Sequence, residues 1–265
     1  MKNFIYIIII LPFTTILAEE LRILSTTSTR DSGLYSYLLP IFDQKYNINS
    51  HVIATGTGHA IKNAENCNGD ILITHAKKLE DEFVDNGYGK IRSNLMYNDF
   101  VLVGPSSDPI KLSTSTNLSD ALSKIYQFMP FFISRGDESG THLSELHIWD
   151  TLIKIKPNPS VNRWYLETGQ GMGATLNVAV GMNAYTYTDR ATWLKFKNKQ
   201  NHVILFENDS LLRNQYGIVL ISNEHCKDIN HNGAAIFYNW ITSNEGQQYI
   251  SKYMLNNRSL FIPNY

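Results

Sequence analysis

Residues 21–34 read LRILSTTSTRDSGL, a stretch that passes from an apolar run through a cluster of hydroxyls into a helical pattern. Its first four residues predict a strand. The apolar residues that recur at helical spacing afterwards predict a helix over 32–44, capped by Asp31 or Ser32. Residues 25–30 are then a loop that the N-terminus of this helix faces. The unit of strand, hydroxyl-rich turn and helix is the basis for predicting the rest of the fold.

The same unit recurs along the chain. Strand signals at 51–54 and 70–73 alternate with a helical pattern at 59–66, and two further helices are expected at 233–243 and 245–253. Alternating strands and helices are typical of a mostly parallel sheet that is covered by helices. The sequence therefore predicts an α/β protein.

Two extended segments, residues 98–105 and 214–221, bracket a central part with strand and helix signals of its own. A middle domain that is inserted into a first domain is joined to it by two crossings. This arrangement predicts two lobes with a cleft and a hinge between them. We place the first lobe at 19–103 and 215–265, and the second lobe at 104–214.

The start of the chain indicates export. A short basic start, an apolar run at residues 4–13 and a small residue at Ala18 are typical of a cleavable signal peptide, which we place at residues 1–18. The run is shorter than the roughly 20 apolar residues that span a membrane. We therefore expect a periplasmic protein whose mature chain is not inserted in the membrane.

The two cysteines of the chain, Cys67 and Cys226, would both lie outside the reducing cytoplasm. A disulfide between them is permitted there. Two separate buried thiols are the alternative, because the sequence does not give the distance between the two Cα atoms.

The composition excludes some classes of function. The chain has 265 residues, of which 43% are hydrophobic and 18% charged, and its formal net charge is -1. This balance indicates neither a nucleic-acid-binding protein nor a disordered acidic tail. If the ligand is an anion, local donors must attract it, because the net charge does not.

Four turns rich in hydroxyls and glycines each lie between an extended and a helical signal, at residues 25–29, 55–58, 134–142 and 168–173. A helix N-terminus presents free N–H groups and about half a positive charge, which suits a tetrahedral oxyanion. Arg135 in the third turn adds a planar fork of donors. Each turn taken singly also has a structural interpretation, in which its hydroxyls cap helices or bind water.

Enzymatic interpretations find less support in the sequence. Ser139, His142 and Asp137 could be written as a nucleophile, a base and an orienting group, but no Gly-x-Ser-x-Gly turn is present. The eight histidines show no zinc-ligand spacing. The turn at 56–58 lacks the third glycine of a dinucleotide-binding loop. We therefore expect no enzymatic activity, no bound metal cation and no cofactor.

Taken together, the turns resemble the signatures of the TupA type of periplasmic tungstate-binding protein, which serves ABC transporters. The resemblance covers nearly the whole mature chain. The departure at Ser25, where the family usually has Thr, keeps a hydroxyl, whereas Ala191 stands where the family often has Gly. The matching segments are Ser25-Thr26-Thr27-Ser28, Gly56-Thr57-Gly58, Met96 to Phe100, Ser134 to Thr141, Trp164-Tyr165, Gly169 to Met172 and Thr188-Asp189-Arg190.

The resemblance implies an α/β, two-lobed periplasmic-binding-protein fold of type II, in which each lobe is a mixed sheet flanked by helices and two crossover strands form the hinge. It also implies that a monomer captures tungstate, or molybdate, between the lobes and delivers it to an ABC transporter permease. A phosphate-binding protein is the alternative, because a similar loop occurs there and Asp137 could accept the proton that phosphate retains. The residues implied to surround the oxyanion are Thr26, Thr27, Ser28, Thr57, Arg135, Ser139 and Thr141, with backbone groups near Gly171.

Overall fold

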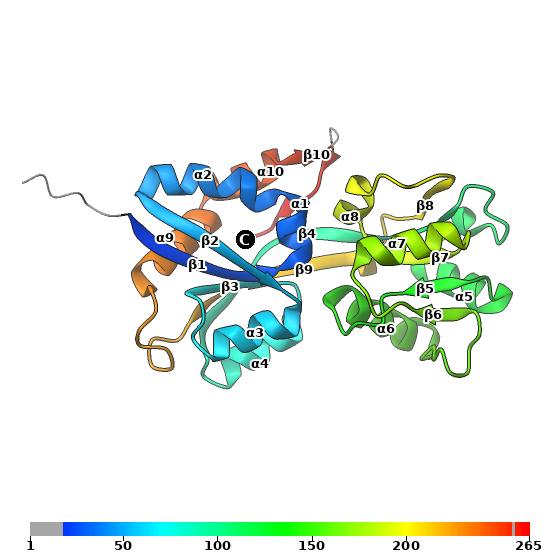
Figure 1. Cartoon of the computed structure of the whole chain (residues 1–265), viewed down its shortest axis with the longest axis horizontal. Helices are drawn as coiled ribbons and strands as arrows, with labels where there is room; N and C mark the ends of the chain where they lie inside the picture. Colours follow the sequence, from blue (N-terminus) through cyan, green and yellow to red (C-terminus); the bar gives the residue numbers. More distant parts are fainter. Residues whose placement is uncertain (1–17, 256–257) are drawn as a thin grey trace, which may run out of the picture.

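The computed structural model describes residues 18–255 and 258–265, so the predicted signal peptide lies outside the described residues except for Ala18. The chain forms two lobes that are joined by two long strands (Figure 1). None of the helices within the described residues is long and apolar enough to cross a membrane.

The sheet of the first lobe is mixed. Strand β1 is parallel to β2 and β3, whereas β9 is antiparallel both to β3 and to the first part of β4. The short C-terminal strand β12 is also antiparallel to β4. The strands span Glu19–Thr26 (β1), Ile48–Thr55 (β2), Ile71–Thr74 (β3), Gly89–Pro105 (β4), Arg213–Ile221 (β9) and Ile262–Pro263 (β12).

Helices cover both faces of this sheet because its strands carry apolar side chains in both directions. One buried cluster joins the sheet to α2, α9 and α10, and a second joins it to α3 and α4. A separate hairpin, β10 (Met254–Leu255) with β11 (Arg258–Ser259), follows α10. The helices span Leu34–Tyr46 (α2), Thr57–Glu65 (α3), Lys77–Asp85 (α4), His231–Thr242 (α9) and Asn244–Lys252 (α10).

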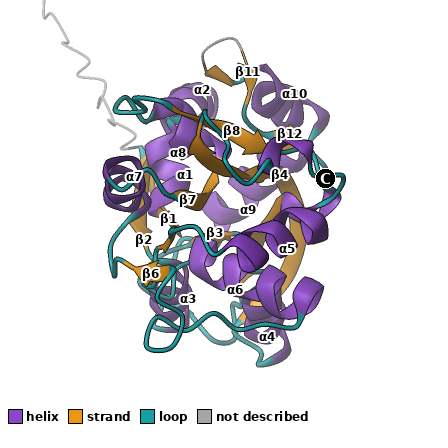
Figure 2. Ribbon diagram, turned by 90° about the vertical axis from the view of Figure 1, so that its right-hand side faces the viewer, coloured by secondary structure: helices purple, strands orange, loops and turns teal. Residues whose placement is uncertain are grey.

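The second lobe repeats this layered arrangement with a five-stranded sheet in the order β8-β4-β7-β5-β6. Helices α5 and α6 pack on one face of this sheet, and α7 and α8 pack on the other (Figure 2). The elements span Leu118–Phe128 (α5), Phe132–Ser134 (β5), Gly140–Ile153 (α6), Tyr165–Glu167 (β6), Met172–Gly181 (α7), Tyr185–Asp189 (β7), Arg190–Lys195 (α8) and His202–Phe206 (β8), with single 3-10 turns at Leu112–Thr114 and Ser210–Leu212.

The hinge consists of β4 and β9. Strand β4 pairs with β9 as far as Asp99, opposite Arg213, and pairs with β7 of the second lobe from Phe100 onward. Both segments that were predicted to cross between the lobes thus lie in these two strands. The lobe limits proposed from the sequence, at 103 and 214, fall within β4 and β9.

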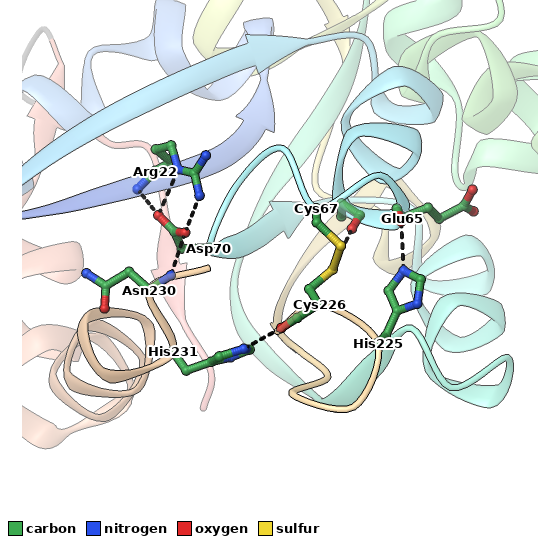
Figure 3. Close-up of a disulfide and its surroundings, with 9 residues drawn as sticks. Arg22, Glu65, Cys67, Asp70, His225, Cys226, Asn230 and His231 are labelled. Atoms are coloured by element: carbon green, nitrogen blue, oxygen red, sulfur yellow. Dashed lines mark hydrogen bonds and ion pairs between the residues drawn. A yellow bond between two sulfur atoms is a disulfide. The ribbon is translucent and has the colours of Figure 1, made fainter. Parts of the chain in front are cut away.

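A disulfide joins Cys67, just after α3, to Cys226 in the segment between β9 and α9 (Figure 3). The two Cα atoms are 5.6 Å apart and the cysteines are 159 residues apart in sequence. Nearby, the ring of His225 bonds the Glu65 carbonyl at 2.7 Å. The bridge therefore ties the chain that returns from the second lobe to the first lobe.

One local prediction is wrong. Residues 25–30 do not form a loop, because β1 continues through Thr26 and Thr27–Ser32 form the short helix α1. The N-cap of helix α2 is Gly33, with φ of 88°, rather than Asp31 or Ser32, although the Ser32 hydroxyl accepts a hydrogen bond from Leu34 N at 3.3 Å. This left-handed conformation suits glycine and separates the two helices.

Candidate functional site

The four donor-rich turns meet at one cavity of about 420 Å³ between the lobes. The turns follow β1, β2, β5 and β6. Strand β1 is parallel to β2, and β5 is parallel to β6, so the turns within each lobe lie at the same edge of its sheet. All the residues predicted to bind an oxyanion line this cavity. They are Thr26, Thr27, Ser28 and Thr57 from the first lobe, and Arg135, Ser139, Thr141 and Gly171 from the second.

Three helices of at least two turns begin at the cavity. Helices α3 and α7 have Gly56 and Gly171 as N-caps, and neither residue has a side chain to accept the first N–H groups of its helix. These amides remain available to a ligand, since a helix cannot satisfy them internally. In α6 the Ser139 hydroxyl accepts a 3.3 Å hydrogen bond from His142 N, which satisfies part of that helix end.

Arg135 is held in place by its own loop. Its Nη2 donates to the carboxylate of Asp137, whose other oxygen accepts from Ser139 N at 3.2 Å. The Nε of Arg135 is buried and has no hydrogen-bond partner among the described residues. The loop depends on Gly136, with φ of 59°, because a Cβ at this position would lie 2.5 Å from the Glu167 Cβ. The guanidinium is thus oriented and keeps a donor free for a ligand.

The hydroxyls of the first lobe form a small network at the cavity. Thr26 Oγ1 lies 2.7 Å from Thr29 Oγ1 and 3.2 Å from Ser28 Oγ. Thr57 and, from the second lobe, Thr141 are also buried. A hydroxyl that is fixed by a neighbour can direct its hydrogen at an anion.

The cavity contains a residue that the sequence did not single out. His75 directly follows β3 and lines the wall of the cavity, with its Nε2 3.5 Å from Ser28 Oγ and its ring 5.1 Å from that of Tyr216. Burial, and to a lesser extent the charge of Arg135, lowers the pKa of His75 to about 4, against a hydrogen bond with its own backbone, which raises it. The sequence signal for His75 was its position directly after a strand that is parallel to β1. A single histidine followed by alanine does not form a recognisable motif.

A buried carboxyl lies behind the cavity. Glu145 of α6 accepts hydrogen bonds from Ser134 Oγ at 2.6 Å, Tyr165 OH at 2.8 Å and Trp149 Nε1 at 3.3 Å. Burial raises the pKa of Glu145 to about 7, against these hydrogen bonds, which lower it. Glu145 thus fixes the end of β5 from which Arg135 projects.

The three residues that could be written as a catalytic triad have other partners. The Ser139 hydroxyl accepts from the backbone of His142, and the His142 Nδ1 accepts from Glu138 N at 3.1 Å. Asp137 is bonded to Arg135 and to Ser139 N. A nucleophile that is activated by a base needs a hydrogen bond between the two side chains, and these contacts do not supply one.

Comparisons with known proteins agree with this geometry. A model of the PBP superfamily domain matches residues 18–245. The chain is 42% identical to the tungstate-binding protein TupA of Peptoclostridium acidaminophilum, over 91% of this chain and 84% of that protein, and 36% identical to TupA of Campylobacter jejuni, over 89% and 87%.

Among solved structures, the tungstate-binding protein TupA of Desulfovibrio alaskensis superimposes with a TM-score of 0.85 and is 40% identical, covering 93% of this chain and 99% of that one. At this identity and coverage the resemblance seen in the sequence motifs extends to the whole fold. The chain belongs to the PBP superfamily and, within it, to the TupA family of substrate-binding proteins of ABC transporters.

Proposed function

We propose that this protein captures tungstate in the cavity between its lobes and delivers it to the permease of an ABC transporter from outside the cytoplasm. The observation that carries the proposal is the convergence of Arg135, the hydroxyl side chains and the N-termini of α3, α6 and α7 on one cavity. Nothing in this arrangement activates a nucleophile, so we expect binding without chemistry. We expect a monomer that has lost residues 1–18.

The donor set favours a fully deprotonated dianion over phosphate. Phosphate retains a proton at neutral pH and needs an acceptor for it, which from the sequence could be Asp137. In the structure Asp137 orients its own loop, because one of its oxygens accepts from Arg135 and the other from Ser139 N. Glu138 is the other carboxylate of the cavity and is exposed. Molybdate has the same charge and nearly the same size as tungstate, so the same donors suit it.

The number of donors is sufficient for tight binding. About six charge-assisted hydrogen bonds, at roughly 1.5–3 kcal/mol each, supply on the order of 9–18 kcal/mol. Association costs at least about 4 kcal/mol. A dissociation constant near the nanomolar range, which corresponds to about -12 kcal/mol, is therefore within reach.

A thermal-shift panel with tungstate, molybdate, sulfate and phosphate tests the proposal, because a ligand that binds only the folded state raises the melting temperature. We expect a large shift with tungstate and with molybdate, and none with phosphate. A shift with phosphate alone would refute the proposed ligand in favour of the alternative. Titration calorimetry on the ions that give a shift then measures their affinities.

A further inference from the structure

We propose that His75 is a further ligand of the oxyanion, which donates from its imidazole to an oxygen of the ion and takes up a proton when the ion binds. This inference rests on the proposed function. It adds a residue from the first lobe that neither the motifs nor the resemblance pointed to, and it predicts that the site binds a proton together with the anion.

The position of His75 carries the first step. Its ring lies at the cavity wall, where Nε2 is 3.5 Å from the hydroxyl of Ser28. Across the cleft, Gly140 at the start of α6 packs against the ring so closely that a Cβ there would be 2.2 Å from His75 Cε1. The imidazole is thus enclosed by both lobes at the point where the donors of both lobes converge.

The hydrogen bonding of His75 carries the second step. Nε2 has only the long contact to Ser28, and Nδ1 is buried and bonds to no other described residue, its own backbone being the nearest polar group that acts on the ring. Ring nitrogens at a cavity wall are normally hydrogen-bonded, and a contact of 3.5 Å is at the limit of the hydrogen-bonding range, so Nε2 can accommodate a better acceptor. An anion beside Ser28 would give Nε2–H an acceptor within the cavity.

The charges around His75 carry the third step. The cavity lining has one formal positive charge, on Arg135, against two negative charges, on Asp137 and Glu138. A dianion that enters the cavity therefore meets a lining of net negative charge. The negative charge of the dianion favours the protonated form of any imidazole that it contacts. Before the ion binds, burial keeps the pKa of His75 low, at about 4. The dianion acts in the opposite direction and raises the pKa of His75.

Few titratable or charged groups face His75 from the surrounding elements. Helix α1 contributes an uncharged hydroxyl and β9 the ring of Tyr216. On α4, the buried carboxylate of Glu80 is bonded to Thr74, Ala76 N and Arg92. On α3, His59 lines the same cavity but is exposed. The remaining charged groups are those of the loop before α6, namely Arg135, Asp137 and Glu138.

The test is titration calorimetry of the full mature protein with micromolar tungstate, in MES and in imidazole buffer, because two buffers with different ionisation enthalpies give the number of protons bound. Below the pKa of the bound state the uptake should approach about one proton per ion, and Kd should then tighten about tenfold for each pH unit of acidification. Uptake should fall toward zero at alkaline pH. Wild-type binding with no proton uptake between about pH 5.5 and pH 8 overturns the inference.

Variants assign the proton to a residue. His75→Gln keeps an amide donor without a titrating ring, so it should bind tungstate more weakly and without proton uptake. His59→Gln, Glu145→Gln and the exposed control His147→Gln should keep the uptake. The inference is overturned if one of these three variants loses the proton uptake while His75→Gln keeps it. Circular dichroism checks that each variant is folded. The two-buffer measurement on the wild type tests the inference even if a variant fails to fold.

The outcomes separate this inference from the proposed function. If the wild type gives no heat and no thermal shift with tungstate at any pH, the proposed function fails, and the role of His75 fails with it. If the wild type binds tungstate but His75→Gln matches it in affinity and in proton count, the proposed function stands and His75 is not a ligand.

Discussion

Replacing Gly140 with alanine should prevent the lobes from closing completely. Gly140 is the first residue of α6 in the second lobe, and an added Cβ would lie 2.2 Å from His75 Cε1, 2.7 Å from His75 Nδ1 and 3.2 Å from Thr57 Oγ1, all in the first lobe. The His75 ring cannot easily move aside, because it packs against Tyr216 and Ser28. The start of α6 must therefore retreat by about 1 Å to restore an ordinary contact distance.

The size of the effect follows from that displacement. A hydrogen bond lengthened by about 1 Å leaves the bonding range. Loss of one or two charge-assisted bonds from the second lobe costs about 1.5–6 kcal/mol, and each 1.4 kcal/mol is about tenfold in affinity. We therefore expect Gly140→Ala to weaken tungstate binding at least about tenfold, with a melting temperature close to that of the wild type in the absence of ligand.

Calorimetry and small-angle X-ray scattering measure the two consequences. The matched control is Gly181→Ala at the end of α7, where an added Cβ meets nothing within 4 Å. Gly140→Ala should compact less on binding than the wild type, whereas Gly181→Ala should match the wild type. In the double variant with His75→Ala, the cost of Gly140→Ala should nearly vanish, because the clashing ring is gone. Wild-type affinity and compaction in Gly140→Ala would refute the reasoning.

Three further predictions concern residues in and behind the site. Arg135→Ala should weaken tungstate binding at least about tenfold with an unchanged circular dichroism spectrum, and Arg135→Lys should not restore it, because a point charge lacks the planar fork; unchanged calorimetric affinity contradicts this. The pKa of Glu145, raised to about 7, means that its contribution to stability is fully present below about pH 4.5 and is lost as the pH rises through 7. Urea unfolding should therefore show Glu145→Gln gaining up to about 3 kcal/mol over the wild type between pH 5 and pH 8, and parallel pH profiles would contradict this. Replacing both Cys67 and Cys226 with serine should lower the free energy of unfolding by about 5 kcal/mol in the chain-entropy model while tungstate affinity stays the same, and an unchanged urea midpoint would contradict this.

Hydrophobic periodicity and turn residues predicted those parts of the fold and the site that are determined by neighbouring residues in the sequence. The turn around Arg135 could be placed between a strand and a helix because its glycines and hydroxyls interrupt two clear periodicities. Four such turns were recognised singly, and the structure brings them together because each follows a strand that is parallel to its neighbour in the sheet. The set of residues around the oxyanion was implied by the resemblance to the TupA family, and in the structure all of them line one cavity.

What local patterns missed depends on tertiary pairing. The mostly parallel sheet expected from alternation is mixed, because β9 returns antiparallel between β3 and β4. Strand β4 is a single strand of 17 residues that serves both lobes, and only its second half was identified as a crossing. His75 escaped notice because its significance arises from Ser28 and Gly140, which lie 47 and 65 positions away in the sequence.

The division of donors between the lobes predicts that binding and closure are one event. Thr26, Ser28 and Thr57 come from the first lobe, while Arg135 and Thr141 come from the second, so neither lobe surrounds an ion alone. A ligand shifts a conformational equilibrium only by the difference between its affinities for the two states. An ion that bonds to donors of both lobes gains most of its affinity in the closed state, and a smaller or protonated anion that satisfies one lobe gains little. A permease that recognises the closed form would therefore distinguish one ion from another by whether the lobes have closed, without contacting the ion.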